Sequence, residues 1–123
     1  MDDSYGEAVE KVTAALKDEG FGIITQIDVK ATIKEKLGED FRPYVILGAC
    51  NPPLAHRALL NEPAVGVMLP CNVTVEQHEA GSRVLIANPM SMMSMADLGE
   101  NPALRAVADE ATDRLKRVAD ALR

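Results

Sequence analysis

The sequence predicts a single α+β domain. Its 123 residues fit one domain, and a chain of this length buries roughly two thirds of its unfolded surface, so that a core can form without disulfides or a metal. Segments with the alternation of strands are interspersed with segments of helical periodicity. In the middle of the chain, Tyr44–Val75 has the pattern of a strand, a helix and a second strand with short joints, and it holds both cysteines.

The first segment predicts a helix followed by a strand. Ser4 and Glu7 fit a capping box, and apolar residues at helical spacing extend the helix over about 4–19. Gly20 is expected to end this helix, because glycine adopts the left-handed conformation at the least cost. Phe21–Ile27 alternates between two faces and is rich in β-branched residues, which predicts a strand.

A second helix and a second strand are expected next. Asp28 can cap the helix, and Gly38 is expected to end it. Residues 39–43 form a connecting loop in which Phe41 is expected to lie inward. Tyr44–Cys50 is a continuous apolar run, which is typical of a buried strand.

The third helix and third strand complete the central unit. Asn51 is expected to cap the helix, Pro52 suits its first position, and Glu62-Pro63 ends it. Val65–Gln77 alternates and predicts a long strand. Pro70 interrupts this strand and lacks an amide donor, so we expect an edge position or a bulge there.

The last third of the chain predicts a hairpin and a long terminal helix. His78–Ser82 has the composition of a turn, and Arg83–Pro89 is the expected return strand. Met90–Gly99 is expected to be irregular or a short helix. Asn101 can cap a helix whose apolar stripe runs to the C-terminus.

The central unit predicts where a site would lie. A strand, a helix and a strand with short joints normally form a βαβ crossover with parallel strands. Tyr44–Cys50 and Val65–Cys71 would then both end at the same edge of the sheet, where open sheets with crossover helices tend to place ligands. Cys50 and Cys71 would share that edge. They would be too far apart to bond if another strand lay between them, because a disulfide needs Cα atoms within ~7 Å.

The thiols and histidines each allow two interpretations. Cys50 precedes the N-terminus of a helix, where the dipole favours a thiolate, but the favoured interpretation is a small buried hydrophobe that ends a core strand. Cys71 lies among Val and Leu and is expected to pack. His56 could pair with Cys50 as in nucleophilic catalysis, or simply lie in a groove or on the surface. His78 is expected to be solvated at the hairpin tip.

Metal and phosphate chemistry find limited support. Met90–Met95 contains four methionines, which suit either packing and interfaces or, together with Cys50 and Cys71, a soft ion such as Cu(I). No spacing typical of a zinc site is present. Pro52 and Pro53 remove two amide donors from the third helix, which argues against a phosphate site there.

The amino-acid composition argues against several classes of binding partner. The net charge of −6 and the 3% aromatic content argue against nucleic acid, which is bound through clustered Lys and Arg and stacking rings. The acidic, polar first residues do not resemble a secretory signal, and no apolar stretch reaches the ~18 residues of a membrane span. We therefore expect a cytoplasmic protein with reduced cysteines and no membrane partner.

Several segments resemble the signature of the domain-of-unknown-function 302 family. The resemblance is close over about 44–95 and looser in the flanking helices, and Leu-Pro-Cys-Asn at 69–72 is its most specific element. The segments that carry it are Gly48–Pro52 (GACNP), Ala55, Ala58-Leu59, Val65–Val73 (VGVMLPCNV), Arg83-Val84 and Asn88–Met90.

The resemblance implies a small α+β protein with helices packed against a curved, mostly antiparallel sheet, similar in outline to the TATA-binding-protein-like fold. It also implies a homodimer, and it supplies no catalytic residues. The site candidates are the positions that match its motif, together with the histidine found by spacing: Cys50, Asn51, Pro70, Cys71, Asn72 and His56.

Three functions remain open from the sequence. The first is a homodimeric binding module with a small-ligand or soft-metal site near the two cysteines. The second is a purely structural or interaction protein in which the cysteines only pack. The third is a thiol-dependent enzyme or redox protein that uses Cys50. The first is favoured by a small margin.

Overall fold

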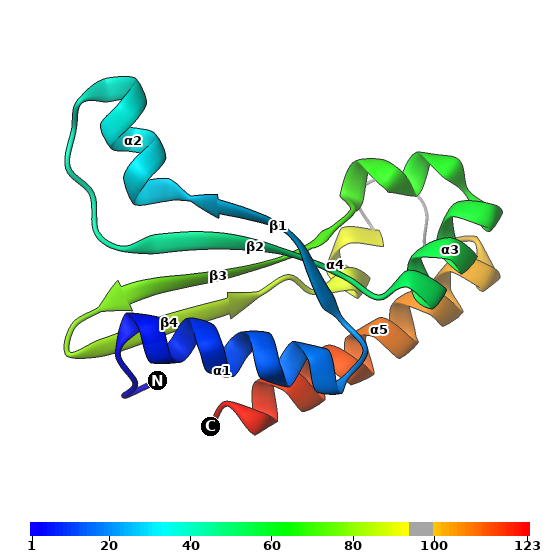
Figure 1. The fold of residues 1–123 in the computed structure, drawn as a ribbon. Coiled ribbons are helices and arrows are strands. Elements are labelled where there is room, and N and C mark those ends of the chain that lie inside the picture. Colours follow the sequence, from blue (N-terminus) through cyan, green and yellow to red (C-terminus); the bar gives the residue numbers. More distant parts are fainter. Residues whose placement is uncertain (94–99) are drawn as a thin grey trace.

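The computed structural model describes residues 1–93 and 100–123 and forms an α+β fold (Figure 1). Four strands alternate irregularly with helices along the chain. The elements are α1 (Tyr5–Asp18), β1 (Gly22–Asp28), α2 (Val29–Leu37), β2 (Tyr44–Cys50), α3 (Pro52–Asn61), the 3₁₀ helix η1 (Pro63–Met68), β3 (Cys71–His78), β4 (Gly81–Ile86), α4 (Pro89–Met93) and α5 (Pro102–Ala121).

The four strands form one antiparallel sheet in the order β1-β2-β3-β4. The α+β class and the antiparallel sheet are therefore as expected. In the register, Leu47 of β2 lies opposite Gln26 on one side and Val73 on the other. A bulge interrupts β1 between Ile23 and Thr25.

One face of the sheet carries the main core. Alternate residues of β2 and β3 point to this face, and α1 and the C-terminal half of α5 cover it (Figure 1). On the opposite face, Ile27 and Leu85 remain 48% and 57% exposed. The cluster comprises Ala8, Val12, Ala15, Leu16, Phe21, Val45, Leu47, Ala49, Val73, Val75, Leu115 and Val118.

A second apolar cluster lies at one end of the sheet. It joins α3, η1 and α4 to the N-terminal half of α5, so α5 takes part in both clusters. Its members are Leu54, Ala58, Val65, Met93, Leu104, Val107, Ala108 and Ala111.

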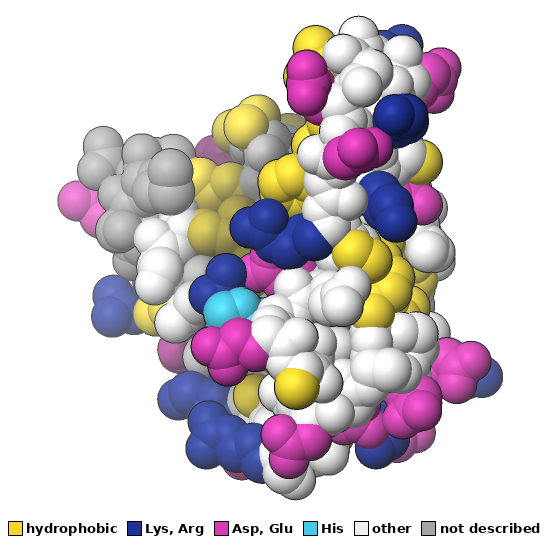
Figure 2. Space-filling model, turned by 90° about the vertical axis from the view of Figure 1, so that its left-hand side faces the viewer, with side chains coloured by type: hydrophobic (Ala, Val, Ile, Leu, Met, Phe, Trp, Pro, Cys, Tyr) yellow, Lys and Arg dark blue, Asp and Glu magenta, His cyan; other side chains and the backbone are white. Residues whose placement is uncertain are grey.

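The helix α2 lies at the other end of the sheet and none of its residues is buried. It projects beyond β1 and β2 in Figure 1 and forms the upper lobe in Figure 2, where acidic and basic side chains are intermingled and apolar side chains are exposed below it. This helix contacts β1 and β2 but contributes no residue to the core, and Leu37 is 70% exposed.

The predicted βαβ crossover is wrong. Residues 63–68 form η1 instead of a strand, and β3 begins at Cys71 and runs antiparallel to β2. Pro63 and the Glu62 side chain, which accepts a hydrogen bond from the Ala64 amide, start a helical turn that the alternation of valines did not reveal. Val67, one of those valines, is 91% exposed.

Two further local expectations changed. Pro70 follows a cis peptide bond and precedes β3, so it is neither a bulge nor an edge residue of that strand. Phe41 is half-buried, with its ring 6.2 Å from that of Tyr44 and under the Arg42 guanidinium.

Within the described residues, no helix has the length and apolar character needed to cross a membrane.

Candidate functional site

An apolar cavity of about 80 Å³ lies between the end of the sheet and the second apolar cluster. Its walls come from the ends of β2 and β3, from α3 and η1, and from α4 and α5. Cys50 and Cys71 both line it. The other lining groups are almost all aliphatic, so an occupant would make very few hydrogen bonds to the walls.

The two cysteines meet because the strands are antiparallel. β2 ends at Cys50, α3 and η1 carry the chain out and back, and β3 begins at Cys71. Cys71 lies opposite Ala49, so Cys50 is one residue further along β2. The cysteines thus share one end of the sheet as expected, but through the opposite strand direction and with no strand between them.

Both cysteines are free thiols and are half-buried. Burial raises the pKa of the Cys71 thiol, and the nearby Cys50 adds to this increase. A thiolate on Cys71 is therefore disfavoured at neutral pH. Its expected role as a small hydrophobe agrees with this environment.

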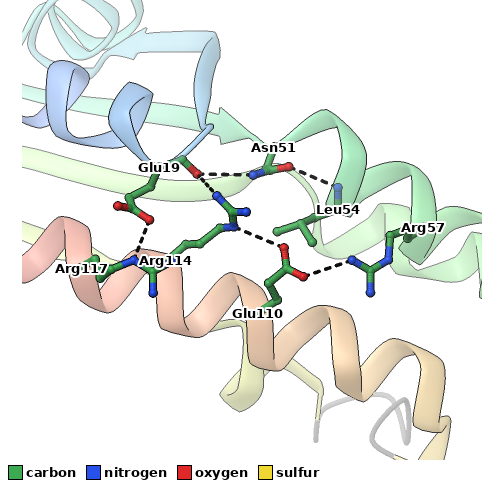
Figure 3. A network of polar contacts seen from close by, with 7 residues as sticks. All are labelled: Glu19, Asn51, Leu54, Arg57, Glu110, Arg114 and Arg117. Atoms are coloured by element: carbon green, nitrogen blue, oxygen red, sulfur yellow. Dashed lines mark hydrogen bonds and ion pairs between the residues drawn. The ribbon is translucent and has the colours of Figure 1, made fainter.

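Asn51 fixes the start of α3 beside the cavity (Figure 3). Its Oδ1 accepts a hydrogen bond from the Leu54 amide at 3.2 Å, and its Nδ2 donates to the Glu19 carbonyl at 3.5 Å. Gly20 has a φ of +85°, and a Cβ there would lie 2.9 Å from that Nδ2. The turn after α1 and the cap of α3 therefore depend on each other.

An ion-pair network supports the same region from outside (Figure 3). Arg114 of α5 donates to the Glu19 carbonyl at 3.0 Å and to the Glu110 carboxylate at 3.3 Å. Arg117 reaches the Glu19 carboxylate at 2.8 Å, and Arg57 of α3 reaches Glu110 at 3.2 Å. Hydrogen bonds from Arg57 and Arg114 lower the pKa of Glu110. The network links α1, α3 and α5.

Of the other candidates, the structure places one at the cavity and two outside it. Pro70 lines the cavity. His56 and Asn72 are exposed and do not line it. A Cys50–His56 catalytic pair is therefore not assembled in this cavity, because His56 faces away on the exposed side of α3. His78 is exposed near the hairpin tip, as expected.

The wall formed by α4 and α5 was not predicted from the sequence. Met92 and Met93 of α4 line the cavity together with small residues such as Ala108 and Ala111 of α5. The sequence feature that could have predicted this wall is the high methionine content of residues 90–95. Met95 itself lies outside the described residues. Within the described residues, no group of three or more His, Cys, Asp or Glu is arranged to hold a metal ion.

Comparisons with known proteins give one family. A family model described as "Domain of unknown function DUF302" matches residues 1–122. The crystal structure of an uncharacterized conserved protein DUF302 from Bacillus stearothermophilus is similar, with 34% identity and a TM-score of 0.88. That match covers 100% of this chain and 94% of the other. No curated protein matches the chain.

Proposed function

This chain belongs to the DUF302 family, and we propose that it is a small homodimeric binding module whose ligand occupies the cavity at the end of the sheet. The observation that carries the proposal is the cavity itself. It is apolar, it is formed by six elements of the fold, and it contains both cysteines. Apolar walls with a few polar groups are typical of ligand sites, and a cavity of about 80 Å³ accepts only a very small ligand.

The chemistry of the walls favours binding over catalysis. The polar groups available at the cavity are two thiols and the Asn51 amide, and both ends of that amide already make hydrogen bonds within the protein. Burial disfavours the thiolate of Cys71, and His56, the expected base, lies outside. The ligand we infer is small and makes few hydrogen bonds, with Cys50 and Cys71 as its neighbours.

The homodimer and the cytoplasmic location are also parts of the proposal, and neither rests on the cavity. The two-subunit state is inferred from the family resemblance. The cytoplasmic location is inferred from the two free cysteines, since a reducing compartment keeps thiols unpaired.

Native mass spectrometry of protein purified without chelator tests these parts together. We expect the mass of two subunits plus a bound small molecule. Ala55 of α3 lines the cavity, and Ala55→Leu fills part of it, so the added mass should be lost. Ala106→Leu is the matched control, because Ala106 is an exposed helical alanine of α5 that does not line the cavity.

Xenon provides a second measurement that does not depend on a ligand surviving purification. Small apolar cavities accept xenon, and we expect it to shift the NMR signals of methyl groups that line the cavity in the wild type but not in Ala55→Leu. Absence of both bound mass and xenon shifts would refute the binding module. The mass of one subunit would refute the homodimer.

A further inference from the structure

Five residues that carry sulphur line the cavity. They are Cys50, Cys71, Met68, Met92 and Met93, and the described residues that line the cavity include no His, Asp or Glu. Assuming the binding module proposed above, we infer that its ligand is a soft monovalent metal ion, Cu(I), held by thiolate and thioether sulphur.

The sulphurs come from four separate parts of the chain. Cys50 ends β2 and Cys71 begins β3, one residue out of register from each other. Met68 ends η1, and Met92 and Met93 lie on α4. Only the folded chain brings them to one cavity, so a metal bound there would link the end of the sheet to both flanking helices.

The donor set selects the class of metal. Thiolates and thioethers are soft ligands that suit Cu(I), whereas Mg²⁺ and Ca²⁺ need oxygen ligands and zinc sites normally use about four nitrogen, sulphur or carboxylate ligands. The described residues contain no group of three or more His, Cys, Asp or Glu for such a zinc site. Thioethers add soft donors without adding charge.

Charge balance also favours a monovalent ion. Binding releases one thiol proton to solvent, and one thiolate with Cu(I) is then electrically neutral. A neutral complex avoids most of the cost of placing an ion between aliphatic walls. The same walls would shield part of the metal from water.

The test is an anaerobic competition titration in which the reduced protein competes with a bathocuproine disulfonate–Cu(I) complex. We expect one Cu(I) per chain, with X-ray absorption showing sulphur neighbours only. Cys50→Ser with Cys71→Ser should weaken binding at least about 100-fold. Met92→Leu with Met93→Leu should weaken it about 10-fold, in the range seen when groups around a metal are removed.

Met90→Leu is the matched control. Met90 packs against the second cluster but does not line the cavity. The affinity of the Met90→Leu protein for Cu(I) should therefore stay at the wild-type value. Met and Leu are similar in volume, so the methionine variants are expected to fold. They keep the test decisive if the double serine variant fails to fold.

Several results would overturn the inference. These are no removal of Cu(I) from the chelator, nitrogen neighbours in the absorption spectrum, or equal binding by the methionine pair and the Met90 control. Xenon entry without copper binding would leave the binding module standing and remove only its metal. The methionines would then serve for packing alone.

Discussion

Gly48 lies in β2 close to the side chains of Thr25 and Pro70. A Cβ at this position would be 2.0 Å from the Thr25 hydroxyl oxygen and 2.8 Å from Cγ of Pro70. Pro70 also lines the cavity. The absence of a side chain at Gly48 therefore allows the segment before β3 to lie close to β2, which is how one residue shapes the site.

Gly48→Ala should lower the free energy of unfolding by about 1–3 kcal/mol, as overpacking commonly does, as measured by urea denaturation. Thr25→Ala removes the closest atom, so a variant that combines Thr25→Ala with Gly48→Ala should recover part of the lost free energy of unfolding. The recovery is only partial because Pro70 stays in place. Gly6→Ala is the control, since nothing lies within 4 Å of a Cβ there. In helix α1 it should stabilise by about 0.5–1 kcal/mol. Equal effects of both substitutions would contradict the steric explanation.

The residues of the site were predictable to different degrees. Cys50, Asn51, Pro70 and Cys71 were identified from the sequence and all line the cavity. His56 was chosen for its spacing from Cys50, but spacing along the chain does not state which side of α3 faces the cavity.

At the scale of elements, α3 is a wall of the cavity that is attached at its start and along its length. Asn51 caps the helix and binds the turn after α1, and Arg57 pairs with Glu110 on α5 at 3.2 Å. Inward, Leu54 and Ala58 join the second cluster. The position of this wall thus depends on one cap, one ion pair and one apolar face.

Asn51→Ala should cost about 0.5–2 kcal/mol, the usual loss for an N-cap, and should also release α3 from the Glu19 carbonyl. Asn101→Ala is the control, because Asn101 caps α5 through the amides of Ala103 and Leu104 and is remote from that turn. Hydrogen exchange measured by NMR should quicken at α3 amides only in Asn51→Ala. Equal protection of α3 in both variants would show that the cap does not hold the wall.

At the scale of the whole molecule, one ion cluster ties three segments together. Glu76 of β3 is 5% exposed and accepts hydrogen bonds from Arg83 of β4 at 2.6 Å and from Arg42, which precedes β2, at 3.1 Å. These bonds, that of Arg83 most strongly, lower the pKa of the Glu76 carboxyl. The stability of the fold is therefore linked to pH.

The sign of the pH effect follows from the lowered pKa. The contribution of Glu76 is complete above the ordinary glutamate pKa of about 4.3 and is lost as pH falls through the lower pKa of the folded protein. Glu76→Gln should cost about 1–3 kcal/mol at pH 7 and should show a smaller further loss in acid. Urea denaturation at pH 7 and in steps below pH 5 measures both effects. Glu35→Gln, an exposed change on α2, should keep the wild-type pH profile, and a Glu76→Gln profile parallel to it would contradict this explanation.

Local chemistry was determined by the sequence alone. Ser4, Asp28, Asn51 and Asn101 all cap the helices for which they were expected, and Gly38 ends α2 in the left-handed conformation. The strand Tyr44–Cys50 was found with its predicted bounds. These features depend mainly on neighbouring residues along the chain, so the local sequence is enough to predict them.

The direction of β3, the helix at 63–68 and the cavity were decided only by the tertiary structure. An alternation of apolar residues fits a strand, but it does not state which partner the strand will have. Pairing Ala49 with Cys71 sets β3 antiparallel to β2, and this pairing joins residues that are far apart in sequence. The same pairing places Cys50 and Cys71 at one cavity, and the other walls form only when the sheet and α5 are packed together.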